Sequence, residues 1–277
     1  MNFSIIYPTR ERWDLLKKAL DSVRDKTLDI ENVEVLLAID DDDTTDYEFL
    51  KQYSFVRPYI VKRSLNFSKD YYTFLAFKST GRWIITSNDD GEFCTKNWDK
   101  IAFEALHDKP NVIYGYIDDG LTGFKARGGG RYCCFPLQGR AGVEAMGFVF
   151  PSRIPIWGAD LWTRNTYDAI NSCVDIPMKI MHYCHHNRTR TQDGVSMRIA
   201  QNQSPYSIRP QQAEIEALFK ALHGRPWDGV IPEPPVPQAH ADQIRRLRGN
   251  FPPRPKSVMP AVPLPKPWTT KKIWISS

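Results

Sequence analysis

Short apolar runs alternate with amphipathic segments over the first hundred residues. The runs predicted as strands lie at 3–8, 33–39, 57–64 and 82–87. The segments 10–27 and 67–80 carry apolar residues at helical spacing, and Gly81 is placed to cap the end of the second helix. This alternation predicts an α/β fold with a parallel sheet, in which ligands bind beyond the carboxyl ends of the strands.

The second half of the chain is less regular. The pattern predicts a strand at 111–118 and an irregular glycine-rich stretch at 125–142. It also predicts three helices, at 97–108, 161–170 and 211–222. From Pro226 onward the chain holds twelve of its 21 prolines, interrupted by a short basic helix at 239–249. We therefore expect one globular domain over 1–224, followed by an extended arm over 225–277.

Composition adds limits on the class of protein. At 42% hydrophobic and 25% charged residues, the 277-residue chain has the balance of a folded globular protein. It contains no apolar run of membrane-spanning length and no apolar signal-peptide region near its start, so we expect a cytoplasmic protein. Its five cysteines form no C-x-x-C pair, which favours free thiols.

The net charge of +5 comes from the proline-rich arm. From Arg225 onward there are nine lysines or arginines against three acidic residues, so the first 224 residues are nearly neutral. The overall basic character is therefore no guide to the substrate of the globular domain.

Two acidic clusters follow predicted strands. Asp40 begins the first cluster, which runs to Asp43, and Asn88, Asp89 and Asp90 close the strand at 82–87. Carboxylates at strand ends are suited to Mn²⁺ or Mg²⁺, which prefer oxygen ligands and share their shell with water and phosphate. The alternative is a solvated turn, because N-D-D-G is common turn chemistry.

The order of three motifs resembles that of the GT-A family-2 glycosyltransferases. They are SIIYPTRER, VEVLLAIDDDDTTD and STGRWIITSNDDGEF. The resemblance implies a GT-A fold with a mostly parallel sheet flanked by helices. It also implies a nucleoside-diphosphate sugar donor, UDP-sugar being favoured, a hydroxyl-bearing acceptor, and a donor half over about 1–100 followed by an acceptor half over about 101–200.

The same resemblance assigns roles to donor-side residues. Thr9 and Asp40 would hold the nucleoside, with Pro8 and Arg10 beside them. The D-x-D signature of the family falls on residues 88–90, where Asn88 replaces the usual first aspartate. It makes Asp90 the metal ligand, and Asp89 would reach ribose or sugar hydroxyls.

On the acceptor side, IWGADLWTRN resembles the segment of the family that carries the catalytic base. This makes Asp160 the base of a displacement with inversion, and the alternative is a helix N-cap. Relatives often complete the metal shell with a late histidine, for which His182 is best placed, although His185 and His186 lie close to it and any of the three can simply pack.

Two arginines complete the predicted donor site. Arg188 and Arg190 have the planar guanidinium groups suited to binding a diphosphate, and the alternative is a solvated basic loop.

Rival functions have weaker support. A nucleotidyltransferase normally opens with a glycine-rich loop, which YPTRERWD lacks, and the histidines and Cys184 have no zinc-ligand spacing. The arm combines basic residues with aromatic ones such as Trp268 and Trp274, so one alternative is a nucleic-acid-binding protein or a DNA-modifying sugar transferase that uses this arm. A strap that joins copies in a homo-oligomer is the other.

Overall fold

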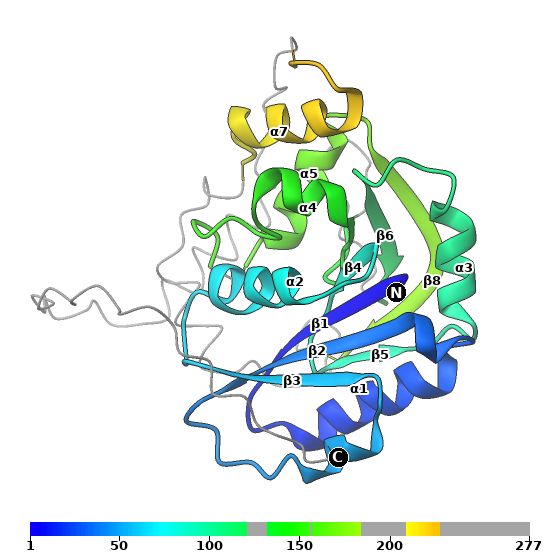
Figure 1. Cartoon of the computed structure of the whole chain (residues 1–277), viewed down its shortest axis with the longest axis vertical. Coiled ribbons are helices and arrows are strands. Elements are labelled where there is room, and N and C mark those ends of the chain that lie inside the picture. Colours follow the sequence, from blue (N-terminus) through cyan, green and yellow to red (C-terminus); the bar gives the residue numbers. More distant parts are fainter. Residues whose placement is uncertain (121–131, 156, 184–208, 228–277) are drawn as a thin grey trace, which may run out of the picture.

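The computed structural model describes residues 1–120, 132–155, 157–183 and 209–227 (Figure 1). Within them one eight-stranded mixed sheet has the order β3-β2-β1-β4-β7-β6-β8-β5. The strands are β1 (Phe3–Thr9), β2 (Val33–Asp40), β3 (Val56–Val61), β4 (Trp83–Thr86), β5 (Gly91–Phe93), β6 (Tyr114–Asp118), β7 (Leu137–Gly139) and β8 (Cys173–His182). Most of the predicted arm therefore lies outside the described residues.

Helices cover both faces of the sheet. They are α1 (Trp13–Lys26), α2 (Phe74–Lys78), α3 (Trp98–Leu106), α4 (Arg140–Met146), α5 (Ala159–Asp168) and α7 (Gln212–His223), with two 3₁₀ turns (Ile30–Asn32 and Glu48–Gln52) and one π-helix (Ser68–Thr73). None of these helices is long and apolar enough to span a membrane.

Alternate residues of the central strands pack on opposite faces, as the two-residue period of a strand requires. On β1, Ile5 packs with α1 and α3, whereas Ile6 packs with α2, α4 and the start of α5. Both faces of β2 are buried along its whole length, as its continuous apolar run predicts. The core is thus two hydrophobic layers separated by one sheet.

The predicted parallel arrangement is confirmed for the first four strands of the sheet order. β1 pairs in parallel with both β2 and β4, and β2 pairs in parallel with β3. Beyond β4, short β7 and β5 run antiparallel to their neighbours and turn the sheet into a mixed one. The α/β architecture agrees with the GT-A expectation, and β1, β2 and β3 all end toward the left of Figure 1.

The prediction that Gly81 caps the second helix is wrong. That helix ends at Lys78, and its C-cap residue Ser79 has extended backbone. Gly81 lies against β1, where a Cβ atom would come within 2.5 Å of Ser4 Oγ and 2.6 Å of the Ser4 nitrogen. A glycine is needed there for close approach of two backbones, not for a left-handed turn.

The prediction that 125–142 is irregular is wrong over its last residues. Residues 137–139 form β7, and α4 starts at Arg140. Neither element shows a clear pattern, because three residues of strand and seven residues of helix are too few for a periodic signal. The pairing of Ile84 with Gln138 creates this strand through long-range contacts.

A buried carboxylate ties together the amino-terminal edge of the sheet. Glu34 Oε1 accepts hydrogen bonds from Ser4 Oγ at 2.7 Å and Thr80 Oγ1 at 2.8 Å, and Oε2 lies 3.0 Å from Arg57 Nη1. Burial favours the neutral acid, but the hydrogen bonds of Thr80 and Ser4 and the charge of Arg57 outweigh it and lower the pKa of Glu34. The carboxylate therefore joins β1, β2, β3 and the turn before β4.

The contact of Gly81 with β1 makes a testable prediction. Gly81→Ala should lower the free energy of unfolding by about 3 kcal/mol, because a backbone atom cannot move aside as the end of a side chain can. The matched control is Gly147→Ala, at a φ of 78° with nothing within 4 Å of the added methyl group, which should cost about 1 kcal/mol. Urea unfolding measures both, and equal losses would contradict the packing argument.

Candidate functional site

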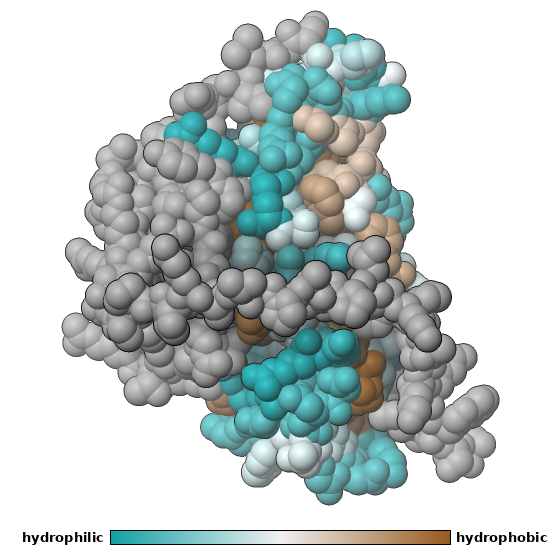
Figure 2. All heavy atoms as spheres, turned by 90° about the vertical axis from the view of Figure 1, so that its left-hand side faces the viewer, coloured by the Kyte–Doolittle hydropathy of each residue, from teal (hydrophilic) through white to brown (hydrophobic). Residues whose placement is uncertain are grey.

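The ends of β1, β2 and β4 bring polar side chains to one edge of the sheet. Thr9 ends β1, Asp40 ends β2, and Asp89 follows β4 after two residues of turn. The space-filling view faces this side of the molecule, and its described part shows hydrophilic areas beside smaller hydrophobic ones (Figure 2). Thr9, Asp40 and Asp89 are themselves buried, so this edge places polar side chains beside the apolar core.

Asp89 is the most deeply buried carboxylate at this edge, with 2% of its surface exposed. Its Oδ2 accepts a hydrogen bond from Thr9 Oγ1 at 2.9 Å, and its Oδ1 accepts one from Arg12 Nη1 at 3.0 Å. Burial raises the pKa of Asp89 to about 6; Arg12 opposes the rise and the charge of Asp90 adds to it. Asp89 thus links the ends of β1 and β4.

Asp40 is held from two sides. Tyr71 donates its hydroxyl proton to Oδ1 at 2.5 Å, and Arg10 Nη1 lies 3.2 Å from Oδ2. Arg10 also forms an ion pair with Asp42 in the loop that follows β2. Pro8 lies on β1 beside Ala38 of β2, so the predicted donor-side residues from Pro8 to Arg10 and Asp40 occupy adjacent strand ends.

Asn88 faces a tyrosine. The hydroxyl of Tyr72 donates to Asn88 Oδ1 and lies 3.2 Å from the carbonyl oxygen of Ser87. The backbone of Asn88 closes the turn, because the Gly91 N–H donates to its carbonyl oxygen at 3.1 Å. The turn predicted from N-D-D-G is present, and it leads directly into β5.

Asp90 and His182 lie side by side although they are far apart in the sequence. β5 pairs with β8 so that Gly91 is opposite His182, and His182 Nε2 lies 3.4 Å from Asp90 Oδ1. The side chain of Asp90 is 10% exposed and that of His182 is 12% exposed. Neighbouring ligands of an octahedral ion at about 2.1 Å lie about 3 Å apart, so this pair has nearly the spacing of two metal ligands.

Four further residues predicted for the donor site fall on other parts of the chain. His185, His186, Arg188 and Arg190 lie outside the described residues. Among the described residues no group of three or more His, Cys, Asp or Glu side chains is arranged to hold a metal. Asp90 and His182 therefore supply a two-residue site, which fits an ion that takes its remaining ligands from water and a bound diphosphate.

Asp160 lies in the first turn of α5. The N-cap residue is Gly158, at a φ of 82°, so the alternative interpretation of Asp160 as the N-cap does not hold. The carboxylate nevertheless accepts the Leu161 N–H at 2.8 Å, one of the amides that a helix start leaves unpaired. Burial raises the pKa of Asp160 to about 6, against the Leu161 hydrogen bond and with a further rise from the charge of Asp119.

Packing and charge both connect Asp160 with the strand-end cluster: Tyr72 shares a hydrophobic cluster with Ala159 and Leu161, the neighbours of Asp160. Burial raises the pKa of Tyr72 well above its usual value, and the charges of Asp90, Asp89 and Asp160 all add to that rise. Tyr72 thus lies within reach of carboxylates from both halves of the domain. The charges of the predicted base and of the predicted metal ligand therefore both act on Tyr72.

Several residues of this region are missed by sequence reasoning. Arg12 and Tyr71 hold Asp89 and Asp40 in place, and Tyr72 holds Asn88. Asp119 is 3% exposed and accepts the Cys134 N–H at 2.8 Å. The signal for Asp119 is present in the sequence, since it follows a predicted strand as Asp40 does. The tyrosines carry no such signal, because in a helix they resemble ordinary core residues.

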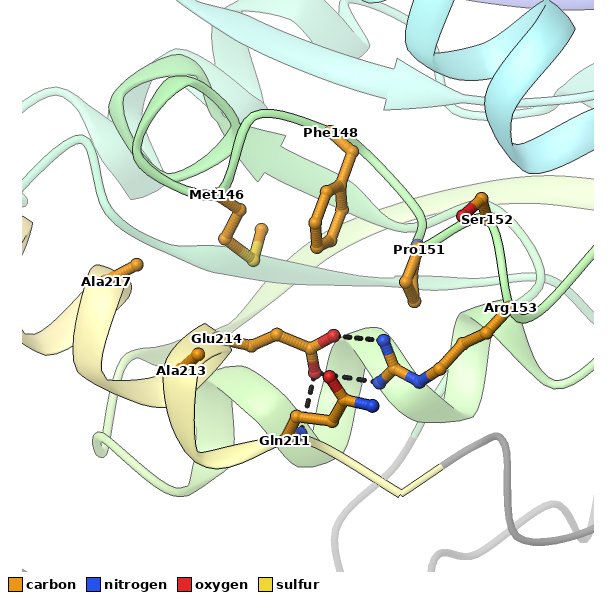
Figure 3. A pocket seen from close by; sticks show the side chains of 9 residues that line it. All are labelled: Met146, Phe148, Pro151, Ser152, Arg153, Gln211, Ala213, Glu214 and Ala217. Carbon is orange, nitrogen blue, oxygen red and sulfur yellow. Dashed lines mark hydrogen bonds and ion pairs between the residues drawn. The ribbon is translucent and has the colours of Figure 1, made fainter.

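A separate pocket of about 380 Å³ lies between the end of α4, the loop after it and α7. In it the side chains of Arg153 and Glu214 point toward each other (Figure 3). Glu214 also accepts the indole N–H of Trp162 at 2.9 Å and the Gln211 N–H at 2.7 Å. The ion pair fastens α7 to the loop after α4, and the Trp162 hydrogen bond fastens α7 to α5. The pocket contains none of the predicted site residues.

Comparisons with known proteins agree with this geometry. The model of the family "Glycosyl transferase family 2" matches residues 4–142, half of the chain. No curated protein matches the chain in sequence.

Two solved structures share the fold at low identity. The structure of S. aureus TarS 1–349 in complex with UDP is 12% identical with a TM-score of 0.52, over 80% of this chain and 70% of that chain. The mannosyltransferase PcManGT from Pyrobaculum calidifontis, in complex with GDP-Man and Mn²⁺, is 14% identical with a TM-score of 0.52, over 91% of this chain and 76% of that chain.

The burial of Asp89 beside Arg12 makes a pH-dependent prediction. Arg12→Ala removes the cation that lowers the pKa of Asp89, so the folded variant must keep an uncompensated buried charge or bind a proton. We expect a loss of about 3 kcal/mol in the free energy of unfolding at pH 8. The loss should shrink below pH 6, where Asp89 is protonated with or without Arg12.

The matched control is Arg24→Ala on α1. Arg24 is 45% exposed and pairs with Asp21 at the surface, so its removal should cost under about 1 kcal/mol at either pH. Denaturant unfolding of both variants at two pH values measures the difference. A loss for Arg12→Ala that is independent of pH would contradict the role given to Asp89.

Proposed function

The chain belongs to glycosyl transferase family 2, and from this premise we propose that it transfers a sugar from a nucleoside diphosphate to a hydroxyl acceptor, with a divalent metal ion and inversion at the anomeric carbon. The single observation that carries this proposal is the convergence of Asp40, Asp89 and Asp90 at one sheet edge, where Tyr72 packs with the start of α5, the helix that carries Asp160. Family membership supplies the reaction class, and the arrangement of these carboxylates supports the division of labour.

The nucleoside end of the donor would bind at β1 and β2. Asp40 is held rigidly by Tyr71 and Arg10, so its carboxylate can accept hydrogen bonds from a base or ribose without a cost in side-chain order. Thr9 already donates to Asp89, which fixes the rotamers of both. UDP is the nucleotide we test first, following the motif resemblance.

Mn²⁺ or Mg²⁺ would bind between Asp90 and His182. The 3.4 Å spacing of their facing atoms and their small exposure support this assignment. When bound, the ion supplies Lewis acidity to the oxygens of the departing diphosphate. The structure of PcManGT holds Mn²⁺ with its nucleotide sugar, which makes Mn²⁺ the first ion to test.

Asp160 would accept the proton of the acceptor hydroxyl. Its raised pKa, about 6, makes it a better proton acceptor than an ordinary aspartate and leaves it ionised at neutral pH. The Leu161 amide fixes the orientation of the carboxylate through Oδ1, and the Cys134 side chain also hydrogen-bonds this carboxylate. A single displacement with this base on the face opposite the diphosphate gives inversion.

The metal assignment makes the first functional prediction. Wild-type protein should bind UDP in the presence of Mn²⁺ and lose at least about 100-fold in affinity with EDTA. Asp90→Ala should cause a similar loss in Mn²⁺ because it removes a charged ligand, whereas Asn88→Ala should cost less. Isothermal calorimetry measures all three, and a larger loss for Asn88→Ala would show that the ligand has been assigned to the wrong residue.

The assignment of Asp160 as the base makes the second functional prediction. Asp160→Asn keeps an acceptor for the Leu161 amide but cannot take up a proton, so turnover should fall about 10² to 10⁴-fold with UDP affinity and melting temperature unchanged. In the wild type, turnover should decline as pH falls through about 6, since the protonated acid is no base. Near-normal turnover of the variant would remove Asp160 from the mechanism.

A further inference from the structure

Asn88 stands where the family has an aspartate, and its side chain is engaged in an unusual way. The Tyr72 hydroxyl donates to Asn88 Oδ1, so the amide oxygen already has a partner. Among the described residues, no hydrogen bond is formed by the amide nitrogen of Asn88. An amide carries two N–H donors at that end, and Asn88 is only partly buried.

The surroundings favour this orientation of the amide. Asp89 and Asp90 follow directly in the chain, so residue 88 lies beside two carboxylates. Burial is the main cause of the raised pKa of Tyr72, and the charges of Asp90 and Asp89 add to it. An amide N–H directed to that side is attracted by carboxylates and by an anionic ligand, whereas an amide oxygen would be repelled. Tyr72 occupies the amide oxygen of Asn88, so the amide N–H groups are the part of this side chain that can bind a ligand.

The tyrosine that orients Asn88 belongs to a π-helical turn, Ser68–Thr73, of a kind often found at functional sites. Consecutive residues of this turn, Tyr71 and Tyr72, serve different strand ends: Tyr71 holds Asp40 after β2, and Tyr72 holds Asn88 after β4. β1 lies between these two strands. Because neighbouring helical side chains diverge, one turn reaches both sides of β1.

We propose that Asn88, oriented by Tyr72, is a hydrogen-bond donor to an oxygen of the bound nucleoside diphosphate and is not a metal ligand. This inference rests on the proposed function, since it concerns the same donor. It assigns to residue 88 the opposite chemistry to that of the family's aspartate, because a carboxylate only accepts whereas this amide nitrogen only donates. Tyr72 is then a positioning residue that acts through Asn88.

Two readouts on the full chain separate a donor from a metal ligand. The first is Mn²⁺ affinity without nucleotide, from the paramagnetic resonance signal of free Mn²⁺. The second is UDP affinity at saturating Mn²⁺, from calorimetry. Asn88→Ala should leave Mn²⁺ affinity unchanged and weaken UDP about tenfold, the effect of one hydrogen bond to a charged group.

Tyr72→Phe tests the positioning role. It should weaken UDP about threefold with Mn²⁺ affinity unchanged, and the double variant should bind UDP no more weakly than Asn88→Ala alone, because Tyr72 acts only through Asn88. Tyr53→Phe is the matched control: its hydroxyl donates to Asp21 at 2.7 Å, away from the site, so it should change neither affinity. Melting temperatures identify any variant whose fold is damaged.

The outcomes are distinct. Weaker Mn²⁺ binding by Asn88→Ala would make residue 88 a ligand and overturn the inference, as would unchanged UDP affinity. Additive losses in the double variant would overturn the role of Tyr72. Wild-type protein that binds neither UDP nor GDP with Mn²⁺ would overturn the proposed function and this inference together, whereas wild-type binding with an unaffected Asn88→Ala overturns the inference alone.

Discussion

The burial of Asp89 between the ends of β1 and β4 is the constraint on which the polar edge of the sheet depends. A carboxylate that is 2% exposed can stay ionised only if donors face both of its oxygens. Thr9 supplies one at the end of β1, and Arg12 supplies the other from the residue that precedes α1. These two bonds fix the loop between β1 and α1 to the turn after β4. The next residue in that turn, Asp90, lies beside His182 of β8.

A second buried carboxylate shows how differently the two ends of the sheet are used. Glu34, near the start of β2, accepts hydrogen bonds from Ser4, Thr80 and Gly81 and has a lowered pKa, so its negative charge is stabilised at neutral pH. Asp89 and Asp160 have raised pKa values because burial outweighs their partners. The amino-terminal edge therefore contributes stability, whereas the carboxyl-terminal edge holds charge that a cation or a proton can relieve.

The strands beyond β4 in the sheet are joined by long-range pairing. β5 is three residues long, and its antiparallel pairing with β8 is what brings His182 to Asp90. Asp119 is drawn into the same region, where its carbonyl oxygen accepts the His182 N–H at 3.1 Å and its charge raises the pKa of Asp160. One strand pair thus connects the expected metal site to the expected base.

The sequence by itself determined the alternation of strands and helices in the first hundred residues, the parallel pairing of the four strands there and the acidic residues at strand ends. Strand and helix periods are local patterns, and the preference of such alternating units for parallel pairing follows from chain order. The motif resemblance singled out Asp90, His182 and Asp160 for roles that remain predictions. Only the tertiary structure decided the partners: Arg12 and Thr9 for Asp89, Tyr71 for Asp40 and Tyr72 for Asn88. Gly81 illustrates the same limit, because a glycine is required there by the close contact with Ser4 on β1 and not by the helix that precedes it in the chain. A hydrogen-bond partner or a close contact between distant segments depends on distances that no local pattern encodes, so these features appear only when the chain is folded.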